Sequence, residues 1–297
     1  MAYVRIDAQL AATVAVAIDE GSFDAAARRL HITPSAVSQR IKAVEQQLGR
    51  VVVVRSRPVR ATEAGEALVR LARQVQLLEH DAVAAFGLGD VDGAVPRIRV
   101  PLAVNADSMA TWFLAPIARV AQRHPIDVDL HRDDQDYTAR LLESGEVMAA
   151  VTSESAPVGG SAVTPLGVLE YRAMATAGYV SRWLPHGATP EALQMAPFVD
   201  FDRRDDLQQD WLRARGVDPW SVPRHYVPAS HDFSQAVRLG LGWGLIPAPQ
   251  ASDDLVELGG RPTRVPLYWQ QWNLRSPLLD ALAAEVLSEA RRVLAPL

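Results

Sequence analysis

The chain has 297 residues, of which 48% are hydrophobic and 22% charged, and its formal net charge is −5 at pH 7. This length suits two or three compact units, each with enough apolar residues to bury a core. The absence of cysteine excludes disulfides, thiol catalysis, Cys-ligated zinc and iron–sulfur clusters, and makes a reducing cytoplasm the expected compartment.

The N-terminal region lacks the charged, apolar and small-residue pattern of a secretory signal. Its longest apolar run, Leu10 to Ile18, has nine residues with a threonine inside it. Since a membrane-spanning helix needs about 20 apolar residues, this run predicts a buried helix from about Ile6 to Glu20, and no membrane partner is expected.

Positive charge is concentrated near the start of the chain. Residues 1–62 contain nine Arg or Lys and five acidic residues, a net charge of +4. Because the whole chain has a net charge of −5, residues 63–297 have a net charge of −9. The stretch from Arg28 to Lys42 has four basic residues and no acidic one. A basic head on an acidic body predicts a polyanionic partner for the head alone.

Two short segments of the head have the apolar spacing of helices. They are marked by Phe23, Ala26, Ala27 and Leu30, and by Val37, Ile41, Val44 and Leu48. Ser22 and Thr33 are suitable N-caps, and Pro34 suits the first position of the second helix. The connection between the helices is short, which predicts a helix-turn-helix.

The outward face of the second helix carries hydroxyl, amide and ammonium groups that can reach base edges and phosphates in a major groove. These residues are Ser35, Ser38, Gln39, Lys42 and Gln46. An ordinary solvated helix face is the alternative. The next segment, Val51 to Val54, is β-branched and is followed by Arg55, Arg57 and Arg60. It predicts a short hairpin, or wing, facing a phosphate backbone.

The run EGSFDAAARRLHITPSAVSQRIKAVEQQLGRVVVVRSRPVRATEAG resembles the winged helix-turn-helix of the LysR-type transcriptional regulators. Val53-Val54-Arg55 stands where family members often have Leu-Phe-Arg, a departure expected to affect core packing more than DNA contact. The resemblance implies a transcriptional regulator without catalytic residues or cofactor, which binds double-stranded DNA and has RNA polymerase as a candidate partner. The expected DNA-binding residues are Arg28, Arg29, Thr33, Pro34, Ser35, Ser38, Gln39, Lys42, Arg55 and Arg57.

A heptad pattern follows the head. Apolar residues at 64, 68, 71, 75, 78, 82 and 85 alternate in steps of four and three, which favours a dimerising helix over a single amphipathic surface helix. With Thr62 as N-cap and Gly87 and Gly89 as terminators, the helix would be roughly 36 Å long. A paired head implies a partly palindromic operator. The family resemblance adds that such dimers often form tetramers.

The body begins after a Gly-, Asp- and Pro-rich boundary, and strand-like runs then alternate with helical ones. This alternation predicts α/β units on a largely parallel sheet. The resemblance implies a two-lobed fold like that of periplasmic binding proteins, with a small effector in the cleft. The expected units are a winged helix-turn-helix at 1–61, a linker helix at 62–90 and an effector domain at 91–297. Lobe 1 would be about 93–163 and 268–297, lobe 2 about 164–267, with hinges near Ala162–Pro165 and Pro266–Trp269.

Candidate effector residues lie where strands run into helices. A helix that starts near Asp107-Ser108 could receive a carboxylate, although either residue could simply cap it. The cluster of Asp133, Asp134 and Asp136 is read as a solvated loop or as the partner of a cation. The expected effector-binding residues are Asn105, Ser108, Met109, Asp134, Thr152, Ser153, Asp202, Ser230, His231 and Asp232.

A narrower resemblance rests on VNADSMATWFLAPI and PLGVLEYRAMATAGY. Both are similar to the lysine- and arginine-responsive regulators of basic amino-acid export, some of which are labelled inhibitors of chromosome replication initiation. This resemblance implies lysine or arginine as the effector, with its carboxylate near Ser108 and Thr152 and its ammonium groups near Asp134, Asp202 or Asp232.

The remaining motifs indicate no cofactor or metal. GLGWG at Gly240 to Gly244 lacks the spacing of a dinucleotide loop and is expected to be a structural turn. The seven histidines have no metal-binding spacing, so no metal site is expected. Two alternatives to the regulator stay open, a nucleoid or replication-origin protein with little sequence preference and an α/β binding protein or enzyme.

Overall fold

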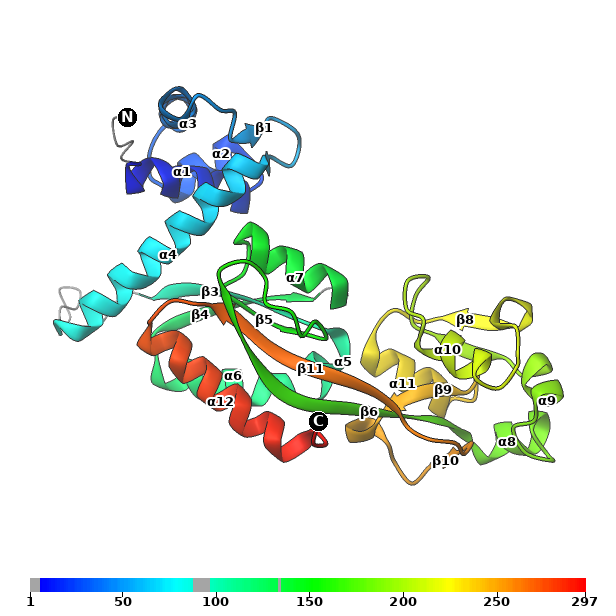
Figure 1. Ribbon diagram of the computed structural model, residues 1–297. Coiled ribbons are helices and arrows are strands. Elements are labelled where there is room, and N and C mark those ends of the chain that lie inside the picture. The colour runs from blue at the N-terminus through cyan, green and yellow to red at the C-terminus, as the bar shows by residue number, and fades with distance from the viewer. Residues whose placement is uncertain (1–5, 88–96, 133–134) are drawn as a thin grey trace.

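The computed structural model describes residues 6–87, 97–132 and 135–297. A small N-terminal head is joined by one long helix to an elongated two-lobed body (Figure 1). The elements of the head and linker are α1 (Ala8–Asp19), α2 (Phe23–Arg29), α3 (Pro34–Leu48), β1 (Val53–Val54), β2 (Arg60–Ala61) and α4 (Glu63–Ala85).

The caps of the head are those that the sequence predicts. The Ser22 hydroxyl accepts a hydrogen bond from the Ala25 N–H, and the Thr33 hydroxyl accepts one from the Ala36 N–H. Pro34 occupies the first turn of α3, where its missing N–H leaves no bond unmade. The helix-turn-helix and the wing, β1 paired with β2, are therefore confirmed.

The body consists of lobe 1, two long strands that cross between the lobes, and lobe 2. Lobe 1 and the crossing strands comprise β3 (Ile98–Val104), α5 (Ala106–Ser108), η1 (Met109–Phe113), α6 (Leu114–Arg123), β4 (Ile126–Arg132), α7 (Gln135–Ser144), β5 (Ala149–Thr152), β6 (Ser161–Thr176), β10 (Leu255–Glu257), β11 (Thr263–Trp272) and α12 (Pro277–Val293). Lobe 2 adds α8 (Ala177–Trp183), α9 (Pro190–Met195), β7 (Phe198–Asp200), α10 (Leu207–Arg213), η2 (Pro219–Ser221), β8 (Arg224–Tyr226), α11 (Ser230–Arg238), β9 (Gly244–Pro247) and η3 (Ala248–Gln250).

The main sheet is mixed rather than largely parallel. Strand β3 pairs in parallel with β4 and β5, but the long strands β6 and β11 pair antiparallel with each other and with their other neighbours. The sequence pattern did not reveal this because β6 and β11 each run through both lobes. The expected hinges, Ala162–Pro165 and Pro266–Trp269, lie inside these two strands, next to a register shift between Leu267 and Tyr268.

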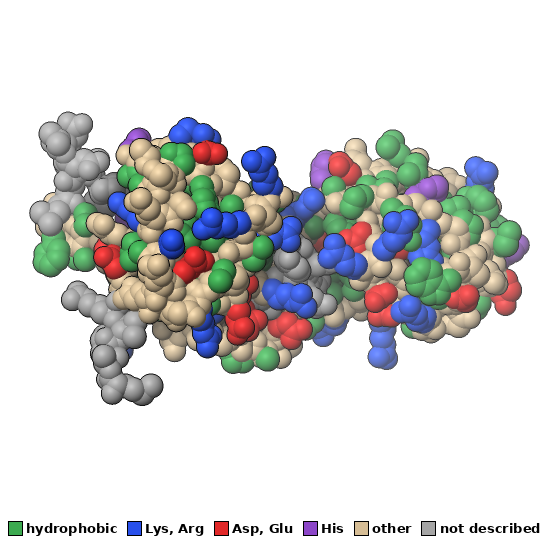
Figure 2. All heavy atoms as spheres, turned by 90° about the horizontal axis from the view of Figure 1, so that it is seen from above, with side chains coloured by type: hydrophobic (Ala, Val, Ile, Leu, Met, Phe, Trp, Pro, Cys, Tyr) green, Lys and Arg blue, Asp and Glu red, His purple; other side chains and the backbone are tan. Residues whose placement is uncertain are grey.

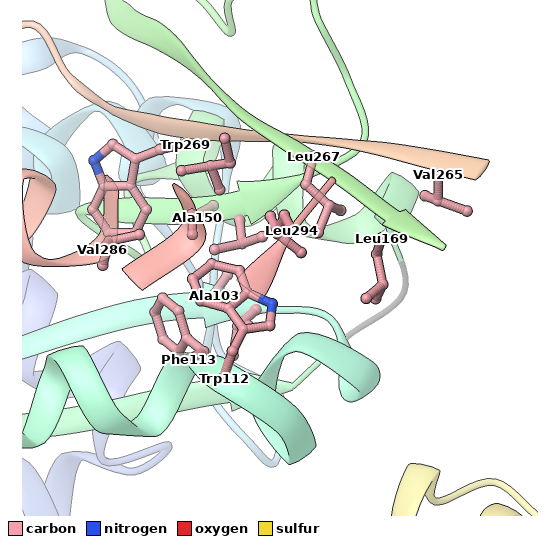
Figure 3. Close-up of a cluster of buried hydrophobic side chains, with 14 of the residues drawn as sticks. Ala103, Trp112, Phe113, Ala150, Leu169, Val265, Leu267, Trp269, Val286 and Leu294 are labelled. Carbon is pink, nitrogen blue, oxygen red and sulfur yellow. The ribbon is translucent and has the colours of Figure 1, made fainter. Parts of the chain in front are cut away.

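Aromatic residues fill the core beneath the crossing strands. Trp269 on β11 is 1% exposed, and its ring centroid lies 6.4 Å from that of Phe113, which meets Trp112 edge to face. Figure 3 shows these rings packed around Ala103 and Ala150 of the sheet, with Val286 of α12 beside them. Trp269 and Trp272 of the YWQQW segment are thus core residues.

The GLGWG segment is the structural turn that the sequence predicts. It leads into β9, and a side chain at Gly242 would lie 2.8 Å from the Pro197 carbonyl oxygen. A side chain at Gly244 would lie 2.7 Å from the Phe233 ring. Close packing therefore accounts for these two glycines.

Candidate functional site

The outward face of α3 is exposed. Val37, Ile41 and Val44 are completely buried in the core of the head, which turns the opposite face of the helix to solvent. Thr33, Pro34, Ser35, Gln39 and Lys42 are exposed, and Ser38 is half-buried on the flank. Figure 2 looks down on the head and shows Lys and Arg side chains on this side of the molecule.

The wing lies next to the start of α2. Arg55 and Arg57 are exposed, and the Arg55 guanidinium lies 5.8 Å from the centre of the Phe23 ring. Together with Ser22 and Asp24 they border an open groove of about 640 Å³. Val53 is buried and Val54 is exposed, so the departure from Leu-Phe-Arg alters one core position and one surface position.

The two arginines of α2 differ in their surroundings. Arg28 is exposed. Arg29 pairs with Glu20 at 2.8 Å and lines a cavity between the head and lobe 1. Arg29 is exposed as well, with 43% of its side chain accessible, so both arginines remain candidate DNA-binding residues.

Different residues of the linker helix α4 pack in the hydrophobic core of the head and in that of the body. Leu68, Val69 and Ala72 pack in the core of the head, whereas Leu77 packs in that of the body. Farther along, Leu78 is 43% and Phe86 76% exposed, and the heptad positions Ala82 and Ala85 are exposed as well. The last part of the predicted seam is therefore an uncovered apolar strip within the single chain.

A cavity of about 190 Å³ lies between the lobes. Its lining includes Asn105, Asp107 and Arg132 from the strand ends of lobe 1 and Asp202 and Asp205 from the segment after β7 in lobe 2. The two lobes also meet through Asp107, whose carboxylate accepts a hydrogen bond from the Tyr171 hydroxyl at 2.7 Å and another from Ser230. Carboxylates therefore face this cavity from both sides.

Burial shifts the acid groups around the cavity toward their neutral forms. It raises the pKa of Asp107, against the hydrogen bonds from Ser230 and Tyr171. It raises the pKa of Asp205 to about 6, with the charges of Asp107 and Asp202 adding to the rise. It raises the pKa of Asp200, a fully buried residue outside the cavity lining, to about 7, although Arg224 at 3.4 Å opposes the shift. A cation would restore the charged forms of these groups.

The predicted effector residues fall into two groups. Asn105 and Asp202 line the cavity, and Ser230 forms a hydrogen bond with Asp107, which also lines it. Asn105 caps the helix by accepting a hydrogen bond from the Ser108 N–H at 3.0 Å, a role that the sequence reading gave to Asp107 or Ser108. The Ser108 hydroxyl is fully buried.

The others lie apart from the cavity lining or outside the described residues. His231 and Asp232 are exposed, Met109 is half-buried in the apolar core, and Thr152 accepts a hydrogen bond from the Glu154 N–H. Ser153, next to Thr152, is half-buried. Asp134 lies outside the described residues.

Sequence reasoning missed Asp107, Asp200 and Asp205 as site residues. The sequence predicts Asp107 only as a helix cap, and within the run FDRRDD it predicts Asp202 alone as an effector-binding residue. The signal that could have found them is their position at or shortly after the ends of β3 and β7, where ligands of α/β sheets bind. Among the described residues no group of three His, Asp or Glu could hold a metal ion. No helix in the described part of the chain has both the length and the apolar character to cross a membrane.

Comparison with known proteins extends the resemblance to nearly the whole chain. Residues 8–66 match the model of the bacterial regulatory helix-turn-helix protein, lysR family, and residues 94–291 match the LysR substrate binding domain. The HTH-type transcriptional regulator LysG of Mycobacterium tuberculosis is 43% identical over 291 residues, 96% of this chain and 94% of that protein. The lysine export transcriptional regulatory protein LysG of Corynebacterium glutamicum is 39% identical over 285 residues, 94% and 96% of the two chains.

Solved structures agree along the full length. The crystal structure of ArgP from Mycobacterium tuberculosis has a TM-score of 0.86 at 42% identity and covers 99% of this chain and 100% of its own. Full-length LysG from Corynebacterium glutamicum with bound effector Arg has a TM-score of 0.77 at 36% identity and covers 98% and 100%. The predicted fold of winged head, linker helix and α/β effector domain is confirmed, and the chain belongs to the LysR family of bacterial helix-turn-helix regulators.

Proposed function

We propose that this protein is a cytoplasmic, non-enzymatic transcriptional regulator that binds DNA through α3 and the wing. The observation that carries this proposal is the exposed row of Ser35, Gln39 and Lys42 on a helix whose other face is fully buried. Short polar groups on such a face read base edges, while arginines on a wing contact phosphates. Units at 1–61, 62–90 and 91–297, with the lobe boundaries and hinges given above, form the proposed organisation.

The second part of the proposal concerns the effector, a basic amino acid bound between the lobes. Asp107, Asp202 and Asp205 face the cavity and would hold the cationic side chain, since a poorly solvated carboxylate gains most from a cationic partner. Arg132, at the end of β4 on the same cavity, would hold the carboxylate of the ligand. The Corynebacterium relative with bound Arg supports this ligand class.

The proposed target is a gene for a basic amino-acid exporter, in line with the lysine export function named for the Corynebacterium relative. Effector binding would close the lobes and change the angle between paired heads, a population shift between two arrangements of the dimer or tetramer. The exposed strip of α4, with Leu78 and Phe86, is the proposed dimer contact.

Binding of effector is tested by calorimetry with arginine, lysine and citrulline. Citrulline has the shape of arginine with a neutral side chain, so it isolates the contribution of the acidic cluster. We expect arginine or lysine to bind and citrulline to bind at least about tenfold more weakly, since hydrogen bonds to charged groups contribute ~1.5–3 kcal/mol. Equal binding of all three ligands would contradict the proposed site.

DNA binding is tested by footprinting on the upstream regions of the protein's own gene and of a neighbouring exporter gene. A discrete, partly palindromic protected site is the expected result. Uniform protection without sequence preference would instead favour a nucleoid or replication-origin protein.

A further inference from the structure

One carboxylate connects the head to both the linker helix and lobe 1. Asp19 is the last residue of α1, and its Oδ1 atom accepts a hydrogen bond from the Arg73 guanidinium of α4. Its Oδ2 atom accepts another from Nη1 of Arg99 on β3 at 3.3 Å. The side chains of Asp19 and Arg73 are only 15% and 10% exposed, so water screens this pairing less than it screens a surface ion pair.

Arg73 continues the connection into lobe 1 by donating a hydrogen bond to the Gly145 carbonyl oxygen, in the turn between α7 and β5. This turn lies directly against α4. Gly145 has a φ of +78°, and a Cβ atom built there would lie 2.7 Å from Cβ of Arg70. The linker helix and lobe 1 are therefore in close backbone contact at this point.

Arg99 leads from the junction toward the effector cavity. Its Nε atom donates to Oδ2 of Asp129 on β4 at 3.0 Å, across strands that pair in parallel along their whole length. Strand β4 ends at Arg132 and β3 is followed by Asn105, and both residues line the cavity between the lobes. Two paired strands thus connect the Asp19 junction with the proposed effector site.

Two other features weaken the contact of α1 and α4 with lobe 1. Glu66 of α4 lies near Glu143 and Glu146, and its pKa is raised by burial and then by the charges of these two residues. Like charges therefore oppose the contact between α4 and α7. A cavity of about 380 Å³ also lies between α1, α4 and β3, lined by small side chains such as Ala12 and Ala15. The head has room to change its angle once the Asp19 contacts are lost.

We propose that Asp19 is a positioning residue that sets the angle of the head relative to lobe 1 and transmits the state of the effector cavity to it. This proposal rests on the proposed function in so far as it requires an effector. A displacement of β3 and β4 on effector binding reaches Arg99, and Arg99 and Arg73 pass it to α1 through the Asp19 carboxylate. Asp19 itself faces the junction cavity and lies outside the predicted DNA-binding residues.

The experiment compares full-length Asp19→Asn with Asp127→Asn. The control removes the partner of Arg97 at the same two paired strands. This exposed ion pair, 2.7 Å long, does not include Asp19, Arg73 or Arg99. Affinity for the protein's own upstream DNA is measured by fluorescence anisotropy with and without arginine, and arginine binding is measured by calorimetry. Hydrogen exchange of α1 and of the turn at Gly145 is followed without ligand.

The expected wild-type ratio of DNA affinities with and without arginine is about 5- to 150-fold, in either direction. Asp19→Asn should bring it to within about twofold of one while arginine affinity is kept, and should speed exchange in α1. Asp127→Asn should behave as wild type. A wild-type ratio in Asp19→Asn overturns the proposal.

The two proposals fail in distinguishable ways. If arginine does not change DNA binding in the wild-type protein, the effector assignment is wrong, and hydrogen exchange alone decides the role of Asp19. Equal exchange in Asp19→Asn and Asp127→Asn then overturns it. If Asp19→Asn does not fold, Arg99→Gln is measured in its place, because it removes the bond between Asp19 and lobe 1 and leaves the Asp19–Arg73 pair intact.

Discussion

The hydroxyl of Tyr171 lies 2.7 Å from Oδ2 of Asp107, at the point where a crossing strand passes the effector cavity. Tyr171 is a core residue of β6, with 1% exposure. It therefore fixes the orientation of a carboxylate whose pKa is raised by burial. The position of this carboxylate is determined before any ligand enters.

Replacement of Asp107 is expected to remove effector binding selectively. Asp107→Asn keeps the shape of the side chain and its bond with Tyr171 but loses the charge. Arginine affinity should fall at least about tenfold, because charge-assisted bonds contribute ~1.5–3 kcal/mol. Calorimetry measures the change, with Asp232→Asn as a control on the exposed start of α11. Unchanged affinity in Asp107→Asn would place the cationic group elsewhere.

Effector binding is expected to strengthen as the pH rises from about 5 to 8. The pKa values of Asp205 and Asp200 are about 6 and about 7, so ligand-free protein is partly protonated there over this range. A cationic ligand favours the charged forms, and binding should release protons. Calorimetry at pH 6.5 in buffers of different ionisation enthalpy counts these protons. Asp205→Asn should reduce the number released, and equal release in both proteins would contradict this assignment.

Through Asp200 and Asp205, a rising pH should lower the stability of the ligand-free protein, whereas it strengthens effector binding. Their pKa values in the folded protein lie above the value of about 3.9 for an unfolded aspartate. Their contribution to the free energy of unfolding is therefore fully present below about pH 4 and is lost as the pH rises through 6 to 7. Urea unfolding at several pH values should show a smaller loss over this range in Asp200→Asn than in the wild type.

Substitutions on the head are expected to distinguish residues that recognise the base sequence from residues that bind all DNA alike. Gln39→Ala should alter which operator variants bind, by ~1–3 kcal/mol at the affected base pair. Arg57→Ala should weaken binding to all sequences alike and lower the slope of affinity against salt by about one. Anisotropy on an operator library at two salt concentrations distinguishes the two effects. A uniform loss in Gln39→Ala would move base reading to another residue.

The exposed strip of α4 is expected to be needed for dimer formation. Leu78→Glu places a charge in the proposed contact and should shift the protein toward monomer. Glu79→Gln, on the neighbouring exposed position, serves as the control. Light scattering after size-exclusion chromatography gives the mass of each, and an unchanged dimer in Leu78→Glu would exclude this strip as the main contact.

The prediction from sequence was most accurate where local chemistry decides structure. Ser22 and Thr33 fix the helix starts of the head, each by accepting a hydrogen bond from the residue three positions on, and Pro34 suits the first turn of α3 because it lacks an N–H. The mixed sheet could not be predicted in the same way, because the pairing of β6 with β11 joins residues about one hundred positions apart. Asp107 and Asp205 were missed as site residues for the same reason, since they come together only through the packing of two lobes.

The shared cores of α4 have a consequence for how the protein unfolds. Leu68 and Val69 are part of the head, and Leu77, two turns farther on, is part of the body. Melting of either unit removes packing from the helix that the other unit needs. Heat should therefore unfold head and body in one cooperative transition, so that the head does not stay folded after the body has unfolded.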